Sequence, residues 1–133
     1  MHLATPSGVE CSDMIVGAYE TIPIYFRSTS SGRQGMEEVL IKTDNVGVRI
    51  LELKGGEALP WHYHSEVTDY IFALDDEIEI QLRSPDENVL LRPGQRYTIS
   101  MGRVHRVVNP CKKSNNYLLI QGVGKYDFKK VGA

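Results

Sequence analysis

Residues 56–76, GEALPWHYHSEVTDYIFALDD, decide both the fold and the candidate site. Within this stretch, His62 and His64 are separated by one residue, and Asp69 follows five residues after His64. In a strand, residues i and i+2 point to the same side, so both imidazoles face one interior. The carboxylate opens the apolar segment DYIFAL, which places it close behind them in the chain. The stretch therefore predicts strands that present metal ligands to an interior.

A second stretch, residues 94–109 (GQRYTISMGRVHRVVN), adds a third histidine at the start of another short strand. Three imidazoles and one carboxylate suit a single divalent ion of iron, manganese, nickel, copper or zinc. The order of metal affinities does not choose among these ions, because geometry and supply decide which one is bound. We therefore predict one divalent transition metal of open identity as the cofactor. Its predicted ligands are His62, His64, Asp69 and His105.

Short β-prone segments make up most of the remaining chain. Residues 78–82 (IEIQL) alternate strictly between apolar and polar, and residues 46–50 (VGVRI) nearly do, which is typical of strands with one buried face. Turn-forming sequences such as GG, RPG and NPCKKSNN separate the segments. The predicted strands are 39–43, 46–53, 61–64, 69–74, 78–82, 89–91, 97–100, 105–108 and 117–122. This succession predicts an all-β sandwich or barrel, because a closed or doubled sheet removes most exposed edges.

The composition fits one globular domain, since 133 residues are too few for two independent cores. Fifteen basic and seventeen acidic residues give a net charge of −2, without the basic surplus of a nucleic-acid binder. No apolar run approaches the roughly 20 residues that span a bilayer, and no secretory signal is recognisable. Cys11 and Cys111 lie far apart without a CxxC partner, which favours two free thiols over one bridge. We expect a cytoplasmic protein that binds small molecules, with no nucleic-acid or membrane partner.

The chain divides into an N-terminal arm, residues 1–35, and a barrel, residues 36–133, with the linker-like STSSGRQG (28–35) between them. The arm contains two apolar, β-prone segments, MIVGAY and IPIYF. Such an arm can add a strand to its own sheet or to the sheet edge of a neighbouring subunit. We therefore predict a homodimer.

The two stretches resemble the motifs of the cupin superfamily, G-x5-HxH-x3-4-E-x6-G and G-x5-PxG-x2-H-x3-N, and the resemblance covers roughly residues 46–122. Asp69 stands where the family usually has glutamate, Asp76 replaces a turn glycine and Ser100 replaces the proline. The resemblance implies a cupin-type double-stranded β-helix, a jelly-roll barrel that is often a homodimer. The matching residues are Gly56, His62, His64, Gly94, Gly102, His105 and Asn109.

Four further residues are candidates for the chemistry. Arg49, Gln81 and Tyr97 lie on segments that line or flank the predicted barrel, where they would fix an anionic or polyhydroxy substrate; surface positions are the alternative. Tyr97 and Glu66 are the nominees for a general acid or base. Glu66 lies an even number of residues from the paired histidines, so it is the replacement ligand if the aspartate is too short to reach the metal. The alternative is that Glu66 is a solvated loop residue.

The family resemblance leaves the reaction open, because cupins include dioxygenases, decarboxylases, isomerases, lyases and non-catalytic binding or storage proteins. We expect a metal-dependent cupin enzyme that acts on a small oxygenated metabolite, such as a keto-acid, sugar acid or enediol. Its chemistry would be oxygenation or Lewis-acid catalysis. The alternative is a non-catalytic ligand-binding or sensor cupin whose metal is structural or absent. A storage protein is the third interpretation, and such a protein needs no ligand set.

Overall fold

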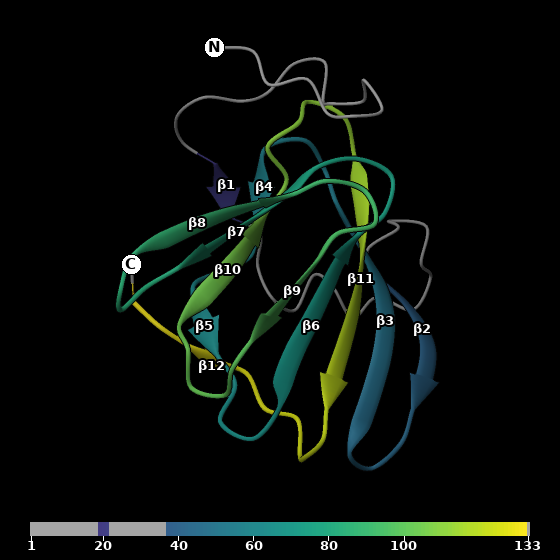
Figure 1. Ribbon diagram of the computed structural model, residues 1–133, viewed down its shortest axis with the longest axis vertical. Helices are drawn as coiled ribbons and strands as arrows, with labels where there is room; N and C mark the ends of the chain where they lie inside the picture. Colours follow the sequence, from purple (N-terminus) through teal and green to yellow (C-terminus); the bar gives the residue numbers. More distant parts are fainter. Residues whose placement is uncertain (1–18, 22–36, 133) are drawn as a thin grey trace.

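The computed structural model describes residues 19–21 and 37–132, which form two layers of β-strands (Figure 1). These residues contain twelve strands and no helix, so the all-β prediction is confirmed. The strands are β1 (Glu20–Thr21), β2 (Glu37–Lys42), β3 (Val46–Leu53), β4 (Glu57–Ala58), β5 (His62–Tyr63), β6 (Thr68–Ala73), β7 (Ile78–Leu82), β8 (Glu87–Leu91), β9 (Arg96–Ile99), β10 (His105–Val108), β11 (Asn115–Gly122) and β12 (Lys129–Lys130).

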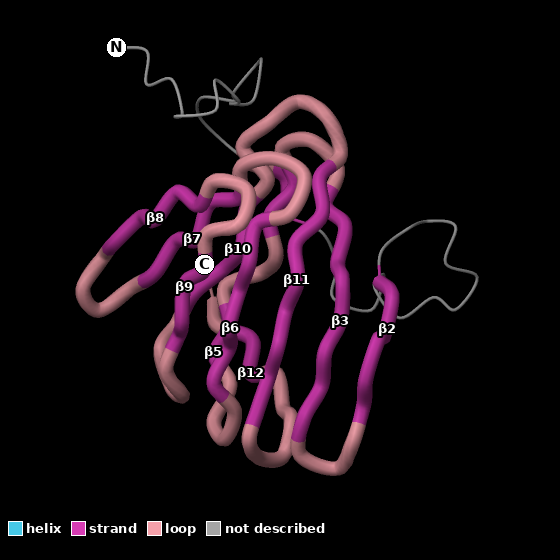
Figure 2. Tube along the Cα trace, turned by 45° about the vertical axis from the view of Figure 1, so that its right-hand side comes forward, coloured by secondary structure: helices cyan, strands magenta, loops and turns pink. Residues whose placement is uncertain are grey.

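The first layer is a five-stranded antiparallel sheet in the order β2-β3-β11-β6-β9. Figure 2 shows four of these strands, β2, β3, β11 and β6, side by side. β11 pairs with β3 along its whole length and with β6 along most of it. Its alternate side chains Tyr117, Leu119 and Gln121 are buried on the inner face, because successive residues of a strand point to opposite faces.

The second layer is organised around β10. This strand pairs along its whole length with β7, and β8 extends the sheet beyond β7. The other edge of β10 meets two short strands: Val108 lies opposite Ala58 of β4, and His105 lies opposite His62 of β5. β12 pairs with β5, and β1 pairs in parallel with β4.

The hydrophobic core fills the space between the two layers. Ile78, Ile80 and Leu82 of β7 are buried while the residues between them are partly exposed, which matches the alternation seen in the sequence. They pack with inner residues of the other sheet, including Leu53 and Ile71. A cluster of polar side chains, the candidate site, lies beside this apolar interior.

Residues of the second sequence motif fix the frame around that site. Gly94 and Gly102 have φ angles of 87° and 80°, which favour glycine, as their predicted turn positions require. The amide of Gly102 donates a hydrogen bond of 2.8 Å to the carbonyl of His64. Asn109 is fully buried, and its amide group donates to the carbonyls of Leu53 and Lys113. The glycine turn and the asparagine therefore hold the loops on either side of β10.

The predicted N-terminal arm lies mostly outside the described residues. Its described part, β1, pairs with β4 of the chain's own sheet, and the division into an arm and a barrel stays a prediction. No helix in the described part of the chain is long and apolar enough to cross a membrane.

The expectation of two free thiols is wrong for Cys111, which is buried and disulfide-bonded. Cys11, the other cysteine of the sequence, lies outside the described residues. Separation along the sequence says nothing about distance in space, and this is why the spacing misled us. Because disulfides are rare in the cytosol, the cysteines no longer support a cytoplasmic location, which stays a prediction.

Candidate metal centre

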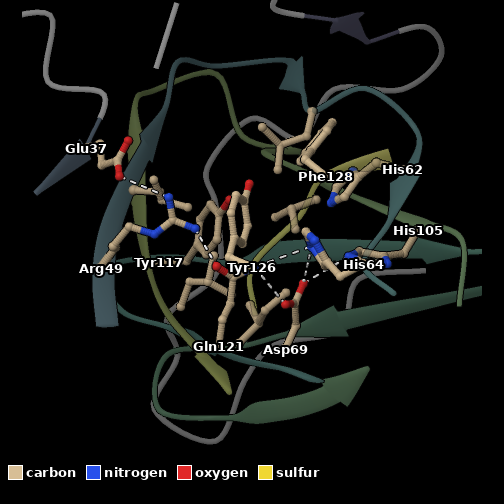
Figure 3. A pocket seen from close by; sticks show the side chains of 15 residues that line it. Glu37, Arg49, His62, His64, Asp69, His105, Tyr117, Gln121, Tyr126 and Phe128 are labelled. Atoms are coloured by element: carbon tan, nitrogen blue, oxygen red, sulfur yellow. Dashed lines mark hydrogen bonds and ion pairs between the residues drawn. The ribbon is translucent and has the colours of Figure 1, made fainter. Parts of the chain in front are cut away.

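Four buried side chains meet at one end of the interior (Figure 3). Their ligand atoms all lie within 4.8 Å of one another, and each residue is at most 4% exposed. They come from three strands and one adjoining loop, so a large part of the barrel contributes to the cluster. These residues are His62, His64, Asp69 and His105.

Strand pairing explains why residues so distant in sequence meet. His105 begins β10 directly opposite His62 of β5, so both rings point to the same side of the sheet. His64 lies on that side by alternation. Asp69 belongs to β6 of the other layer, where it is buried while the following Tyr70 is exposed. Asp69 therefore faces the histidines across the interior.

Each histidine is oriented by a backbone carbonyl. The Nδ1 atoms of His62, His64 and His105 lie 2.7, 2.6 and 2.7 Å from the carbonyl oxygens of Pro60, Asp127 and Arg103. A carbonyl oxygen only accepts hydrogen bonds, so each Nδ1 carries the proton. This leaves the Nε2 lone pair of each neutral ring for a metal, the usual arrangement of metal-binding histidines.

The carboxylate of Asp69 completes the donor set. Its Oδ2 lies 3.0 Å from Nε2 of His105 and 3.2 Å from Nε2 of His64. Two neutral imidazole nitrogens and a carboxylate are all acceptors, so a cation must lie among them, either as protons or as a metal ion. The donor types and their close approach fit a metal ion, which would take the place of the shared protons, and the shorter Asp69 reaches the cluster in place of glutamate.

Burial and charge give the four groups different pKa values. Burial and the neighbouring His105 lower the pKa of His62 to about 3, so this ring is neutral at physiological pH. Burial also lowers the pKa of His64, but the hydrogen bond and the charge of Asp69, together with the contact to Asp127, outweigh burial and raise that pKa. Burial raises the pKa of Asp69, but hydrogen bonds from His105 and His64 outweigh it and hold the pKa well below its usual range. Asp69 is therefore ionised and ready to bind a cation.

A line of hydrogen bonds leads from Asp69 to the far wall of the cavity. Gln121 donates from Nε2 to Oδ1 of Asp69 at 2.9 Å. The side-chain oxygen of Gln121 accepts a hydrogen bond from Nη2 of Arg49, whose Nη1 donates to Oε2 of Glu37 at 3.0 Å. Glu37, Arg49 and Gln121 come from β2, β3 and β11, three neighbouring strands of the five-stranded sheet.

The segment between β11 and β12 covers the cluster. The ring of Phe128 stacks on His62, with centroids 4.1 Å apart and planes inclined by 14°. Tyr126 lies 5.6 Å from the ring of His64 and 5.5 Å from the Arg49 guanidinium carbon. The Asp127 carboxylate accepts hydrogen bonds from the amide and the hydroxyl of Ser65. We call residues 126–128 the cap.

A cavity of about 270 Å³ lies between the cluster, the cap and Arg49. Its remaining walls are mainly apolar side chains of both sheets, such as Leu59, Ile71 and Val107. The cavity is therefore a small, mainly apolar chamber with the candidate metal ligands at one end and a guanidinium at the other.

No family model and no curated protein matches the sequence. Solved structures do match. A conserved protein with a double-stranded β-helix domain from Klebsiella pneumoniae superposes with a TM-score of 0.62 at 16% identity, over 84% of this chain and 96% of that chain. A cupin superfamily protein from Desulfitobacterium hafniense superposes with a TM-score of 0.58 at 19% identity, over 67% of this chain and 77% of that chain.

The chain has the cupin fold. An oxalate oxidase also shares it, with a TM-score of 0.62 at 17% identity over 79% of this chain and 58% of that chain. The predicted double-stranded β-helix is thus confirmed. Identities this low establish the fold and leave the reaction open.

The structure brings one of the four other candidate residues to the cavity and places the other three elsewhere. Arg49 lines it. Gln81 bonds instead to Glu79 and Arg106 along the outer side of β7 and β10, and Tyr97 packs against the hydrophobic core. Glu66 is exposed in the loop between β5 and β6. None of these last three is among the described residues that line the cavity.

Glu37, Gln121, Tyr126 and Phe128 are among the lining residues that were not predicted from the sequence. The alternation along residues 117–122 could have identified Gln121, because it places this residue on the same buried face as Tyr117. The motif spacing carries no signal for the cap, which lies beyond the second motif.

Proposed function

We propose that this chain is a metal-dependent cupin enzyme acting on a small oxygenated metabolite such as a keto-acid, a sugar acid or an enediol. The observation that carries the proposal is the donor set itself: three oriented Nε2 atoms and one ionised carboxylate, within 4.8 Å of one another, beside a cavity of about 270 Å³. A metal held by His62, His64, Asp69 and His105 would supply Lewis-acid or redox chemistry. The donor set fits iron, manganese, nickel, copper or zinc.

The chain's own residues would bind and orient the substrate. Arg49 at the far wall offers its guanidinium to anionic or hydroxyl oxygens. Phe128 and Tyr126 exclude water from the cluster. Burial raises the pKa of Tyr126, so its phenol keeps its proton at neutral pH and can donate it to a substrate oxygen. Because Tyr97 and Glu66 lie away from the cavity, Tyr126 is the acid–base residue that we nominate.

One observation favours a non-catalytic binding protein as the second candidate. Among the described residues that line the cavity, both carboxylates are engaged: Asp69 by histidines and Glu37 by Arg49. This leaves no carboxylate as a ready general base. An enzyme will convert a bound acid to product, whereas a binding protein will show saturable binding without turnover.

Elemental analysis of protein purified without chelator or affinity metal tests the proposal, beside the His62→Ala/His105→Ala double variant. We expect close to one transition-metal ion per chain in the wild type and none in the variant. If both proteins remain free of metal after incubation with each candidate ion, the metal-dependent function is wrong.

We also propose a homodimer. β2 lies at the edge of the five-stranded sheet, and it exposes Val39, Leu40 and Ile41 by 53, 47 and 56%. Exposed apolar residues on an edge strand favour pairing with another chain. Light scattering should give twice the chain mass for the wild type and the chain mass for Leu40→Lys. A wild-type monomer would refute the dimer without affecting the metal site.

A further inference from the structure

The wall opposite the metal ligands is built around a guanidinium that already holds a carboxylate of the same chain. Nη1 of Arg49 donates to Oε2 of Glu37 at 3.0 Å, and Nη2 donates to the side-chain oxygen of Gln121. The side chains of Arg49 and Glu37 are 21 and 18% exposed. A guanidinium has five N–H donors in a planar fork that suits carboxylates, and these two bonds use two of them.

Glu37 is free to leave this position at low cost. It is the first residue of β2, an edge strand, and a substrate carboxylate that takes its place keeps Arg49 paired, so the exchange loses no ion pair. A second cavity of about 160 Å³ shares Glu37, Arg49, Gln121 and Tyr126 with the first and extends beneath the turn between β2 and β3. The Glu37 side chain therefore has space beside it into which it can turn.

We propose that Arg49 is the binding site for a carboxylate group of the substrate and that Glu37 occupies this site until the substrate displaces it. The inference rests on the proposed function, because it assigns the second end of the same cavity. The ligand is a small carboxylic acid that carries a further oxygen function, which reaches the metal ligands while its carboxylate lies on Arg49.

Gln121 sets the distance between the two ends. Its amide nitrogen bonds Asp69 and its amide oxygen bonds Arg49, so the guanidinium and the metal-binding carboxylate are separated by the width of one carboxamide. The cavity, at about 270 Å³, lies just below the range of about 300–1,000 Å³ that is usual for ligand pockets. Both measures point to a short acid.

The ion pair also explains how neutral molecules are rejected. A carboxylate that replaces Glu37 leaves Arg49 paired, and Glu37 gains water. A neutral sugar or enediol that displaced Glu37 would leave the guanidinium without a counter-charge in a mostly buried wall, which is unfavourable. Of the substrates named above, the site therefore selects keto-acids and sugar acids over neutral enediols.

A matched pair of probes tests this on the full chain loaded with zinc. Succinic monohydroxamic acid has a metal-binding hydroxamate at one end and a carboxylate at the other, and the corresponding carboxamide is its neutral control. We expect calorimetry to show tighter binding of the carboxylate. Glu37→Gln should increase that preference by about three- to ten-fold, because the internal competitor loses its charge. Arg49→Lys should abolish the preference, because lysine lacks the fork.

Glu38→Gln is the control variant, since it removes the same charge from the next residue of the same strand, which alternation directs to the opposite face. It should leave the preference unchanged. The inference is wrong if Glu37→Gln leaves the carboxylate preference at its wild-type value, or if Arg49→Lys retains it. Thermal unfolding of each variant will show that the chains remain folded.

A metal-independent measurement separates this inference from the proposed function. Propionate and propionamide, titrated by NMR into chelator-treated protein, report on Arg49 alone. If zinc does not bind but Glu37→Gln still tightens propionate selectively, the metal-dependent function fails and the carboxylate site stands. If zinc binds and neither probe pair responds to Glu37→Gln, the carboxylate site fails by itself.

Discussion

The two ends of the cavity hold their charges in different ways. At the metal end, the ligands are at most 4% exposed, and each histidine is oriented by a backbone carbonyl. We call the other end the acid end, because it is the proposed site for the carboxylate of the substrate. There, Arg49 and Glu37 are long side chains, 21 and 18% exposed, that orient each other. The partners of the histidines are main-chain carbonyls, which no side-chain rotation removes, whereas the side-chain partners of Arg49 and Glu37 can rotate. The comparison suggests that one end is organised before binding and that the other adjusts to its ligand.

Removing the negative charge of Asp69 should cause the largest loss of metal affinity. Asp69→Asn keeps the shape of the side chain but removes the anion that faces His64 and His105. We expect metal affinity to fall by about a hundred-fold or more, because removing one partner of a buried charge cluster costs about 3–5 kcal/mol. Competition with a chelating dye measures the affinity.

Asp75→Asn is the matched control, since Asp75 is exposed and bonds Asn116 at the surface. It should bind metal like the wild type. Wild-type affinity in Asp69→Asn would show that the three histidines hold the ion without the carboxylate.

The metal end was predictable from sequence because its information is local. His62 and His64 are two residues apart and face the same side, and the turn glycines need unusual backbone angles, so spacing indicated both the four candidate ligands and the fold. The short strand β12 was not predictable, because two lysines have low β-propensity and pair only where β5 offers a free edge.

The acid end depends on which strands become neighbours. Arg49 was a candidate from its residue type, but its meeting with Glu37 and Gln121 follows from the order β2-β3-β11. No local pattern encodes that order. Gln81 had equally good alternation, yet its strand turns this residue to the outer side of the sheet, because alternation gives two faces without saying which is the inner one.

Acid should destabilise the metal-free protein through His62. Its pKa is about 3 in the folded chain and near 6.5 when unfolded, so between these values the unfolded chain binds the extra proton. Stability therefore falls as pH decreases from about 6.5 to 3, by an amount on the order of 4–5 kcal/mol. His64, with a raised pKa, contributes in the opposite sense: its stabilisation is complete below about 6.5 and is lost as pH rises through the folded pKa.

Urea unfolding of chelator-treated protein at several pH values measures this dependence. His62→Gln should flatten the decline toward acid, because glutamine binds no proton. An equally steep decline in His62→Gln would assign the effect to other groups.

Phe128 should matter less than any metal ligand. Its ring lies against His62 at 4.1 Å, so it fixes the plane of that imidazole and excludes water. We expect Phe128→Ala to weaken metal binding by about ten-fold, the lower end of what is lost when a partner of a metal ligand is removed. Phe128→Tyr keeps the stacked ring and should retain most of the affinity. Equal losses in both variants would show that stacking does not orient His62.

Ser65 should have the smallest effect, because it acts on the metal end through two intermediates. Its hydroxyl donates to the Asp127 carboxylate, and the Asp127 carbonyl in turn orients His64. Ser65→Ala keeps the second bond to Asp127, which comes from the backbone amide at 2.9 Å. We expect a loss of at most about 1 kcal/mol in the free energy of unfolding and about two-fold in metal affinity.

Ser100→Ala, at another exposed serine near the motif, should change neither quantity. A ten-fold loss of metal affinity in Ser65→Ala would mean that the serine hydroxyl, and not the pairing of β12 with β5, positions the cap. A small loss would agree with a metal end whose orienting groups are supplied by the backbone, because the carbonyl that binds His64 is present whatever side chain stands at position 127. The acid end has no such safeguard, since each of its contacts ends in a side chain that one substitution can remove.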